Sequence, residues 1–240
     1  MFTKVSIYII YVAMSDAIED FPMVNQPPAE NNSFRGIHHP LAYKVSVNLG
    51  NAIFGAHLHG TENIPSEPAV YVPSHRSALD IPPVAIGIYA AKGEPVRFMA
   101  KKEMKLWDLP IVGWWMRTGG VLPITQRRDQ VNIDELRPFI DAAKDGQNVV
   151  IFGEGTRGEG PKIDSLQPGA LLVAALAKRS IVPVGVAGTK PFKYRRFHAV
   201  FGEAIPADEV YELRRAKAAG TEVLRQQLQV VFDKANSYLK

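Results

Sequence analysis

The stretch Ala69-Val-Tyr-Val-Pro-Ser-His-Arg-Ser-Ala-Leu-Asp80 decides the fold of this chain. It begins with an apolar, β-rich run, which is typical of a buried strand. The residues from about Asp80 to Ala91 suit a helix instead, so a strand turns directly into a helix. This arrangement indicates an α/β protein, in which polar side chains at strand ends commonly form the functional site. His75 and Asp80 lie at such a strand end.

Outward from this stretch, short β-rich runs alternate with helical stretches. The spacing of apolar residues predicts helices over residues 133–143, over residues 169–178 after Pro168, and from Glu222 onward. The alternation predicts an α/β fold in which a single domain has a mixed, largely parallel central sheet flanked by helices. Further strands are predicted at residues 96–100, 121–125, 148–152, 181–186 and 198–201.

The first 58 residues have a different character. Residues 1–14 are apolar, and residues 15–40 form an irregular, proline-containing linker. From Leu41 to Leu58 apolar residues recur about every four positions, which is the spacing of an amphipathic helix. We therefore expect residues 1–58 to contain an apolar segment, a linker and a membrane-associating helix, and residues 59–240 to form the α/β domain. The alternative for that helix is packing on the core.

The length of the apolar runs and the composition exclude several classes of protein and of functional site. The apolar run Val5–Met14 is shorter than the ~18 residues that span a bilayer, so we expect a peripheral protein. The chain has no cysteine, which excludes disulfides, thiolate metal sites and a cysteine nucleophile. The net charge of +4 is compatible with anionic lipid, nucleic acid or a phosphorylated small molecule. The histidines other than His75 lack carboxylates at metal-ligand spacing, so no metal site is predicted.

His75 and Asp80 have the side chains of a general-base pair. If a helix begins near Ser77 or Ala78, Asp80 lies in its first turn, where its oxygens can reach back toward the imidazole. The carboxylate would fix the tautomer of His75 and stabilise the imidazolium that forms when this side chain accepts a proton. Deprotonation of an alcohol requires such a base. On its own, a pair at this spacing is also compatible with a structural role.

A second motif, Phe152-Gly-Glu-Gly-Thr-Arg157, follows a predicted strand. Its glycines allow close approach to an anion, Thr156 offers a hydroxyl donor, and Arg157 has a planar guanidinium that suits phosphate. The alternative is a glycine-rich turn in which Glu154 and Arg157 form an ion pair or bond to the local backbone. The motif lacks the Lys-Ser/Thr ending of a nucleotide-binding P-loop.

Together the two motifs resemble those of the glycerolipid acyltransferase family, which includes the 1-acyl-sn-glycerol-3-phosphate acyltransferases. The first family motif, His-x4-Asp, corresponds to His75–Asp80, and the third, Glu-Gly-Thr-Arg, to Glu154–Arg157. Residues 119–128 resemble the second motif and residues 181–185 the fourth, in the expected order. Four ordered motifs across about residues 60–205 are far more specific than any one of them.

The resemblance implies an enzyme, a 1-acylglycerol-3-phosphate O-acyltransferase, in which His75 is the base and Asp80 orients it. In the second motif, Arg128 is eligible beside Arg127 for contact with phosphate. Lys102 belongs to a lysine pair, and paired lysines are more often part of a solvated surface. The implied substrate-binding residues are Glu154, Gly155, Thr156, Arg157, Arg127 and Lys102.

The implied reaction moves a fatty acyl group from acyl-CoA or acyl-ACP to the free hydroxyl of 1-acyl-glycerol-3-phosphate, giving phosphatidic acid. The implied partners are these substrates, a lysophosphatidic acid or related phospholipid among them, and the cytoplasmic face of the cell membrane. We expect no cofactor, no metal and no nucleic acid.

Several alternatives remain open at this point. Within the family, the acceptor could be glycerol-3-phosphate, another lysophospholipid or a glycolipid. A serine hydrolase that uses Ser74 or Ser77 is less favoured, because no Gly-x-Ser-x-Gly nucleophile elbow is present. A non-catalytic lipid-binding protein is the rival from another class.

Overall fold

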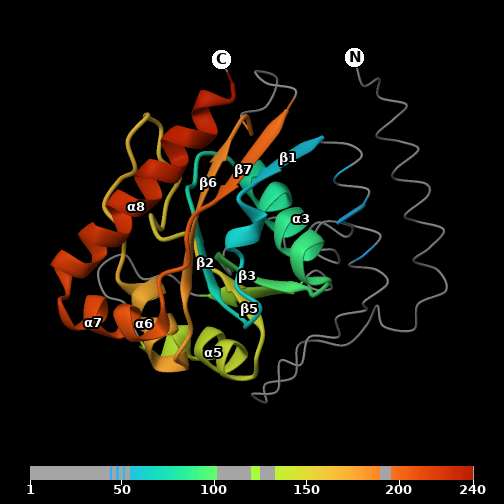
Figure 1. Cartoon of the computed structure of the whole chain (residues 1–240). Helices are drawn as coiled ribbons and strands as arrows, with labels where there is room; N and C mark the ends of the chain where they lie inside the picture. The colour runs from blue at the N-terminus through green and yellow to red at the C-terminus, as the bar shows by residue number, and fades with distance from the viewer. Residues whose placement is uncertain are drawn as a thin grey trace. The chain divides into compact units, whose positions relative to one another are not determined.

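A computed structural model of the chain describes residues 44, 47–48, 51, 55–101, 120–124, 133–189 and 196–239 (Figure 1). At its centre lies a seven-stranded sheet with the strand order β1-β7-β6-β2-β5-β3-β4. The strands are β1 (Ala56–His59), β2 (Val70–Pro73), β3 (Val96–Lys101), β4 (Val121–Ile124), β5 (Asn148–Val150), β6 (Ile181–Ala187) and β7 (Phe197–Phe201).

The sheet is mixed and largely parallel, as predicted. Strands β2, β3, β4, β5 and β6 all run in the same direction. Strand β7 is antiparallel to β6, and β1 is parallel to β7. Parallel neighbours need crossover connections, which are usually helical. As a result, the carboxyl ends of the adjacent strands β6, β2 and β5 meet at one edge of the sheet.

Helices cover both faces of the sheet (Figure 1). On one face, Ile88 of α3 belongs to the same buried cluster as Val182 of β6. On the other face, α5, α6 and α8 contribute to a cluster in which Leu171 and Leu228 are buried with Ile181. Neighbouring β6 residues thus face opposite layers. The helices are α3 (Ile81–Lys92), α5 (Ile133–Lys144), α6 (Gly169–Ala177), α7 (Ala207–Arg215) and α8 (Ala218–Ser237).

The predicted helix over residues 41–58 was wrong at its end. Residues Ala56–His59 form β1, which pairs in parallel with β7, so the predicted boundary between residues 58 and 59 falls inside a strand. Gly55 has a φ of 58°, a left-handed conformation that ends a helix. Upstream, Val47 is helical and buried in the same cluster as Ile88 of α3, so at this position the predicted helix packs on the core.

Residues 1–43, which include the predicted apolar segment and linker, lie outside the described residues. In the described part of the chain, every helix is too short or too polar to cross a membrane.

Candidate active site

Three neighbouring parallel strands supply the polar side chains of one site. His75 follows β2, Glu154 follows β5, and Thr189 follows β6. Because these strands are adjacent and parallel, their carboxyl ends bring together residues that are far apart in the sequence.

A helix-capping motif places Asp80 beside His75. Ser77 precedes a 3-10 turn, Ala78–Asp80, that leads into α3. Its side chain accepts a hydrogen bond from the backbone N–H of Leu79 at 3.1 Å, and its own backbone N–H donates to the Asp80 carboxylate at 2.7 Å. This reciprocal capping box holds the carboxylate at the start of the helix. The predicted position of Asp80 in the first turn is confirmed.

The His75 imidazole and the Asp80 carboxylate are in direct contact. His75 Nδ1 lies 3.0 Å from Asp80 Oδ2, and the Asp80 side chain is fully buried. The His75 side chain remains 17% exposed, and its ring lies against Phe152 with the ring centroids 4.2 Å apart. With Nδ1 engaged by the carboxylate, Nε2 is the nitrogen left to accept a proton from a substrate.

Glu154 is not placed to touch a substrate, which corrects its predicted role. Its side chain is fully buried, and it pairs with Arg76 at 2.7 Å. One carboxylate oxygen also accepts the backbone N–H of His75 at 2.9 Å, and the other that of Asp164 at 3.2 Å. Glu154 therefore ties the loop after β5 to the loop that carries His75, rather than binding the acceptor.

Arg76 is a site residue that the sequence did not reveal. Its guanidinium donates to the carbonyl oxygens of Gly160 at 3.1 Å and Lys162 at 2.7 Å, and lies 4.8 Å from the ring centroid of Phe232. These contacts satisfy a nearly buried charge that would otherwise be costly. The pattern of the first motif leaves position 76 unspecified, so only the spatial order of β2 and β5 reveals its partner Glu154.

The loop that carries the Glu-Gly-Thr-Arg motif is bonded to His75 at Gly158. The backbone N–H of Gly158 donates to the carbonyl oxygen of His75 at 2.9 Å, which pins this loop beside the imidazole. Gly155 has a φ of 67°, and Thr156 and Arg157 are exposed. Among the described residues, neither side chain has a hydrogen-bond or ion-pair partner, so the expected alternative of a Glu154–Arg157 pair is not found.

Arg127, Arg128 and Lys102 lie outside the described residues, so their roles stay predictions.

Both serines next to His75 have structural roles. Ser74 is fully buried, accepts the backbone N–H of Val186 at 2.9 Å and donates to the carbonyl oxygen of the same residue. Ser77 is the helix cap. Neither hydroxyl is presented as a nucleophile, which weighs against the serine-hydrolase alternative.

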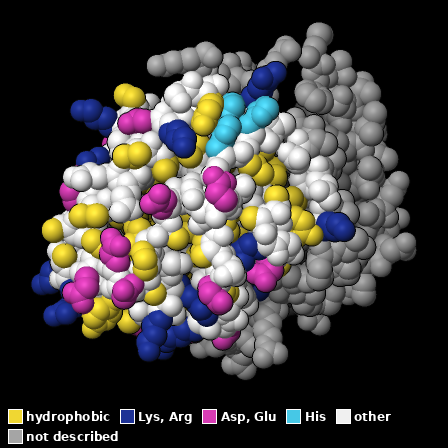
Figure 2. Space-filling model, viewed as in Figure 1, with side chains coloured by type: hydrophobic (Ala, Val, Ile, Leu, Met, Phe, Trp, Pro, Cys, Tyr) yellow, Lys and Arg dark blue, Asp and Glu magenta, His cyan; other side chains and the backbone are white. Residues whose placement is uncertain are grey.

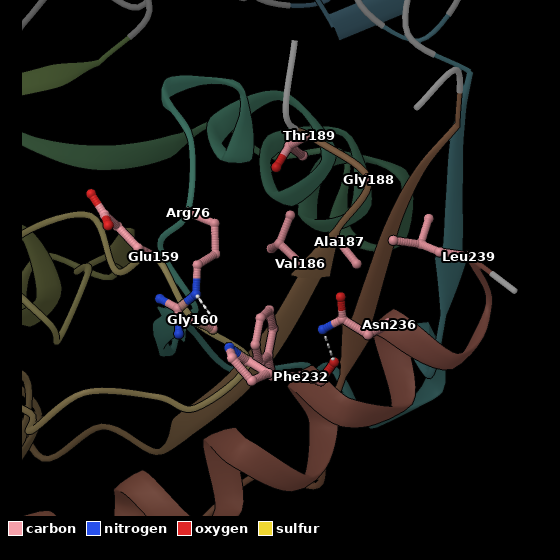
Figure 3. A pocket seen from close by; sticks show the side chains of 11 residues that line it. Arg76, Glu159, Gly160, Val186, Ala187, Gly188, Thr189, Phe232, Asn236 and Leu239 are labelled. Atoms are coloured by element: carbon pink, nitrogen blue, oxygen red, sulfur yellow. Dashed lines mark hydrogen bonds between the residues drawn. The ribbon is translucent and has the colours of Figure 1, made fainter. Parts of the chain in front are cut away.

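A pocket of about 190 Å³ lies at the carboxyl end of β6 (Figure 3). Its wall includes the end of β6, the C-terminal half of α8 and the loop around Gly160. Arg76 and Thr189 both line it, and Thr189 also donates a hydrogen bond to Asp80.

Three other histidines gather on β1 and β7, and histidines form a patch in Figure 2 (cyan). His59 Nε2 lies 3.3 Å from His198 Nδ1, and both rings stack on Tyr238, which directly follows α8. His57 stacks on His198 with the ring centroids 5.0 Å apart. Within the described ranges, no group of three or more potential ligands is arranged to hold a metal ion.

Comparisons with known proteins agree with this fold. Residues 55–187 match the family model described as Acyltransferase. This match covers more than half of the chain, and the chain belongs to the acyltransferase family. It is similar to a chloroplastic 1-acyl-sn-glycerol-3-phosphate acyltransferase of Arabidopsis thaliana, with 32% identity over 157 residues, 65% of this chain and 42% of the relative.

Two further similarities extend this result. A lyso-ornithine lipid O-acyltransferase of Pseudomonas aeruginosa is 30% identical over 123 residues, 51% of this chain and 44% of that protein. The chain thus spans less than half the length of these curated relatives. The crystal structure of the 1-acyl-sn-glycerophosphate acyltransferase PlsC from Thermotoga maritima shares the fold, with a TM-score of 0.60, 20% identity, and coverage of 95% of this chain and 92% of that one.

Proposed function

We propose that this protein is a 1-acylglycerol-3-phosphate O-acyltransferase that transfers a fatty acyl group from acyl-CoA or acyl-ACP to 1-acyl-glycerol-3-phosphate, giving phosphatidic acid. The contact between His75 and the buried Asp80 carboxylate at the end of β2 is the observation that carries this proposal. The similar Arabidopsis thaliana protein is named as a 1-acyl-sn-glycerol-3-phosphate acyltransferase, which supports this choice of acceptor.

The geometry supports direct transfer without an acyl-enzyme. His75 Nε2 accepts the proton of the acceptor hydroxyl while the hydroxyl oxygen forms a bond to the thioester carbonyl carbon. Asp80 stabilises the resulting imidazolium through Nδ1. The carbon–sulfur bond then breaks, and the imidazolium returns its proton to the departing thiolate. Neither Ser74 nor Ser77 has to take part, because both hydroxyls are engaged elsewhere.

Arg157 and Thr156 are the described residues best placed to hold the acceptor phosphate. Both are exposed, and they directly precede Gly158, whose backbone bonds to His75. A planar guanidinium binds phosphate through paired, charge-assisted hydrogen bonds. A phosphate held there would bring the acceptor hydroxyl toward Nε2, and such positioning can supply a large part of a rate enhancement. Arg127 and Lys102 are proposed to add positive charge from the second motif and its upstream segment.

The test is transfer of radiolabelled palmitoyl-CoA to 1-acyl-glycerol-3-phosphate in detergent micelles. His75→Ala should abolish transfer, and Asp80→Ala should lower it steeply. His57→Ala, which changes a histidine of the edge strand β1, is the matched control and should retain activity. Parallel reactions with palmitoyl-ACP, glycerol-3-phosphate and another lysolipid identify the donor and the acceptor. Full activity in His75→Ala would overturn the mechanism, and lipid binding without turnover on any substrate would favour a non-catalytic lipid-binding protein.

We also propose that the protein works as a peripheral protein at the cytoplasmic face of the cell membrane, because its acceptor is a membrane lipid. Deletion of residues 1–40 leaves β1 and the helical position Val47 in place, and should weaken co-sedimentation with vesicles of anionic lipid. Unchanged sedimentation of the shortened protein would contradict a membrane role for this segment.

A further inference from the structure

The two oxygens of the Asp80 carboxylate have different partners. Oδ2 accepts hydrogen bonds from His75 Nδ1 at 3.0 Å and from the backbone N–H groups of Arg76 and Ser77 at 2.6 and 2.7 Å. Among the described residues, Oδ1 accepts only from the hydroxyl of Thr189. The first three donors are close to Asp80 in the sequence, whereas Thr189 lies 109 positions away.

The chain is built to hold Thr189 in this position. Thr189 is only 2% exposed and comes two residues after the end of β6. The intervening Gly188 has a φ of 81°, and a Cβ there would collide with the carbonyl oxygen of Arg196. Glycine is therefore needed at the turn that carries Thr189 to the wall of the pocket (Figure 3).

We propose that Thr189 is a positioning residue of acyl transfer, which acts through Asp80 on His75. This inference rests on the proposed function. The torsion that turns a carboxylate plane is soft, and the two oxygens turn together, so a donor on Oδ1 adds to the restraint that the three donors on Oδ2 provide. The Thr189 bond to Oδ1 fixes the plane and keeps Oδ2 directed at Nδ1 of His75. This alignment matters most when the imidazole carries its transient positive charge.

The kinetic test compares two substitutions of similar size. Thr189→Val keeps the branched shape and removes the hydroxyl, and should lower kcat roughly 10- to 100-fold, the range that corresponds to one hydrogen bond to a charged group. KM for both substrates should change by less than about threefold, because Thr189 acts on the transition state through the base. Thr189→Ser restores the hydroxyl and should recover most of kcat. Normal kcat in Thr189→Val, or equal losses in the Val and Ser variants, would overturn the proposal.

A spectroscopic test separates this inference from the proposed function. The proton on His75 Nδ1 is observed by NMR in protein labelled at histidine, and is assigned by its loss in His75→Ala. Its resonance should shift or broaden in Thr189→Val and stay in place in Thr189→Ser. Thr221→Val is the matched control, because among the described residues that hydroxyl bonds only to the carbonyl oxygen of Ala218 at the start of α8.

The outcomes of the two tests can be told apart. If the natural protein transferred no acyl group, the proposed function would fail while the NMR comparison still decided the role of Thr189. An identical His75 resonance in Thr189→Val and the natural protein would overturn that role. If Thr189→Val does not fold, Thr189→Ala provides the same comparison with Thr189→Ser.

Discussion

Arg76 and Glu154 form a buried ion pair at 2.7 Å that joins the loop after β2 to the loop after β5, with side chains 5% and 0% exposed. Because Glu154 also accepts the backbone N–H of His75, this pair fixes the backbone from which the imidazole projects. The pair therefore supports the site through the backbone of His75.

Glu154→Gln is expected to destabilise the protein strongly. The change keeps the shape of the side chain but leaves the Arg76 charge buried without its partner, which typically costs about 3–5 kcal/mol. Urea denaturation followed by circular dichroism measures the free energy of unfolding. Glu212→Gln breaks an exposed pair with Arg215 and should leave the unfolding midpoint almost unchanged. Equal, small effects of the two substitutions would show that the buried pair is not needed for stability.

Arg157→Ala is expected to weaken acceptor binding while leaving the fold intact. The side chain is exposed and makes no hydrogen bond or ion pair with the described residues, so the melting temperature should not change. Loss of a guanidinium–phosphate contact should raise KM for 1-acyl-glycerol-3-phosphate by roughly tenfold or more. The acceptor KM of Arg157→Lys should lie between those of the natural protein and Arg157→Ala, because lysine keeps the charge without the planar geometry. A normal acceptor KM in Arg157→Ala would assign phosphate binding to other residues.

Gly158→Ala is expected to harm both stability and activity. A Cβ at this position would collide with the Arg76 guanidinium and the Asp164 carboxylate. The Gly158 backbone also bonds to the His75 carbonyl oxygen, so relief of the collision would move the loop away from the imidazole. We expect a loss of about 1–3 kcal/mol in unfolding free energy, together with a lower kcat. At Gly160 the nearest atom to an added Cβ is 3.9 Å away, so Gly160→Ala should leave stability unchanged.

The histidine patch predicts a loss of stability in mild acid. Burial, followed by His57 and Lys234, lowers the pKa of His59 from 6.5. Burial, followed by His57, His59 and Arg196, lowers the pKa of His198. The unfolded chain therefore binds more protons than the folded one as pH falls through 6.5, and stability decreases in that direction.

Thermal melts at about pH 7.5 and about pH 5.5 measure this effect. From the higher to the lower pH, the melting temperature of the natural protein should fall further than that of His198→Gln. The same acid loss in both proteins would exclude His198 as its source.

The sequence allowed the His75–Asp80 contact to be predicted because the two residues are close neighbours across one strand-to-helix turn. The partner of Glu154 could not be predicted, because it depends on which strands are adjacent in the sheet. Helix α7 was missed because it is short and mostly polar, and Val210 is its only buried residue. Strand β1 was mistaken for helix because Leu58 continues the apolar spacing of the preceding residues.

The contacts of Asp80 also predict when catalytic activity appears during folding. The bond to His75 joins residues five positions apart and can form as soon as the turn after β2 does. The bond to Thr189 spans 109 positions and has to wait until β6 has docked beside β2. Long-range pairings of this kind form late because closing a long loop costs chain entropy. Refolding followed by activity should therefore lag behind refolding followed by helical signal, since the final alignment of the base requires a nearly complete sheet.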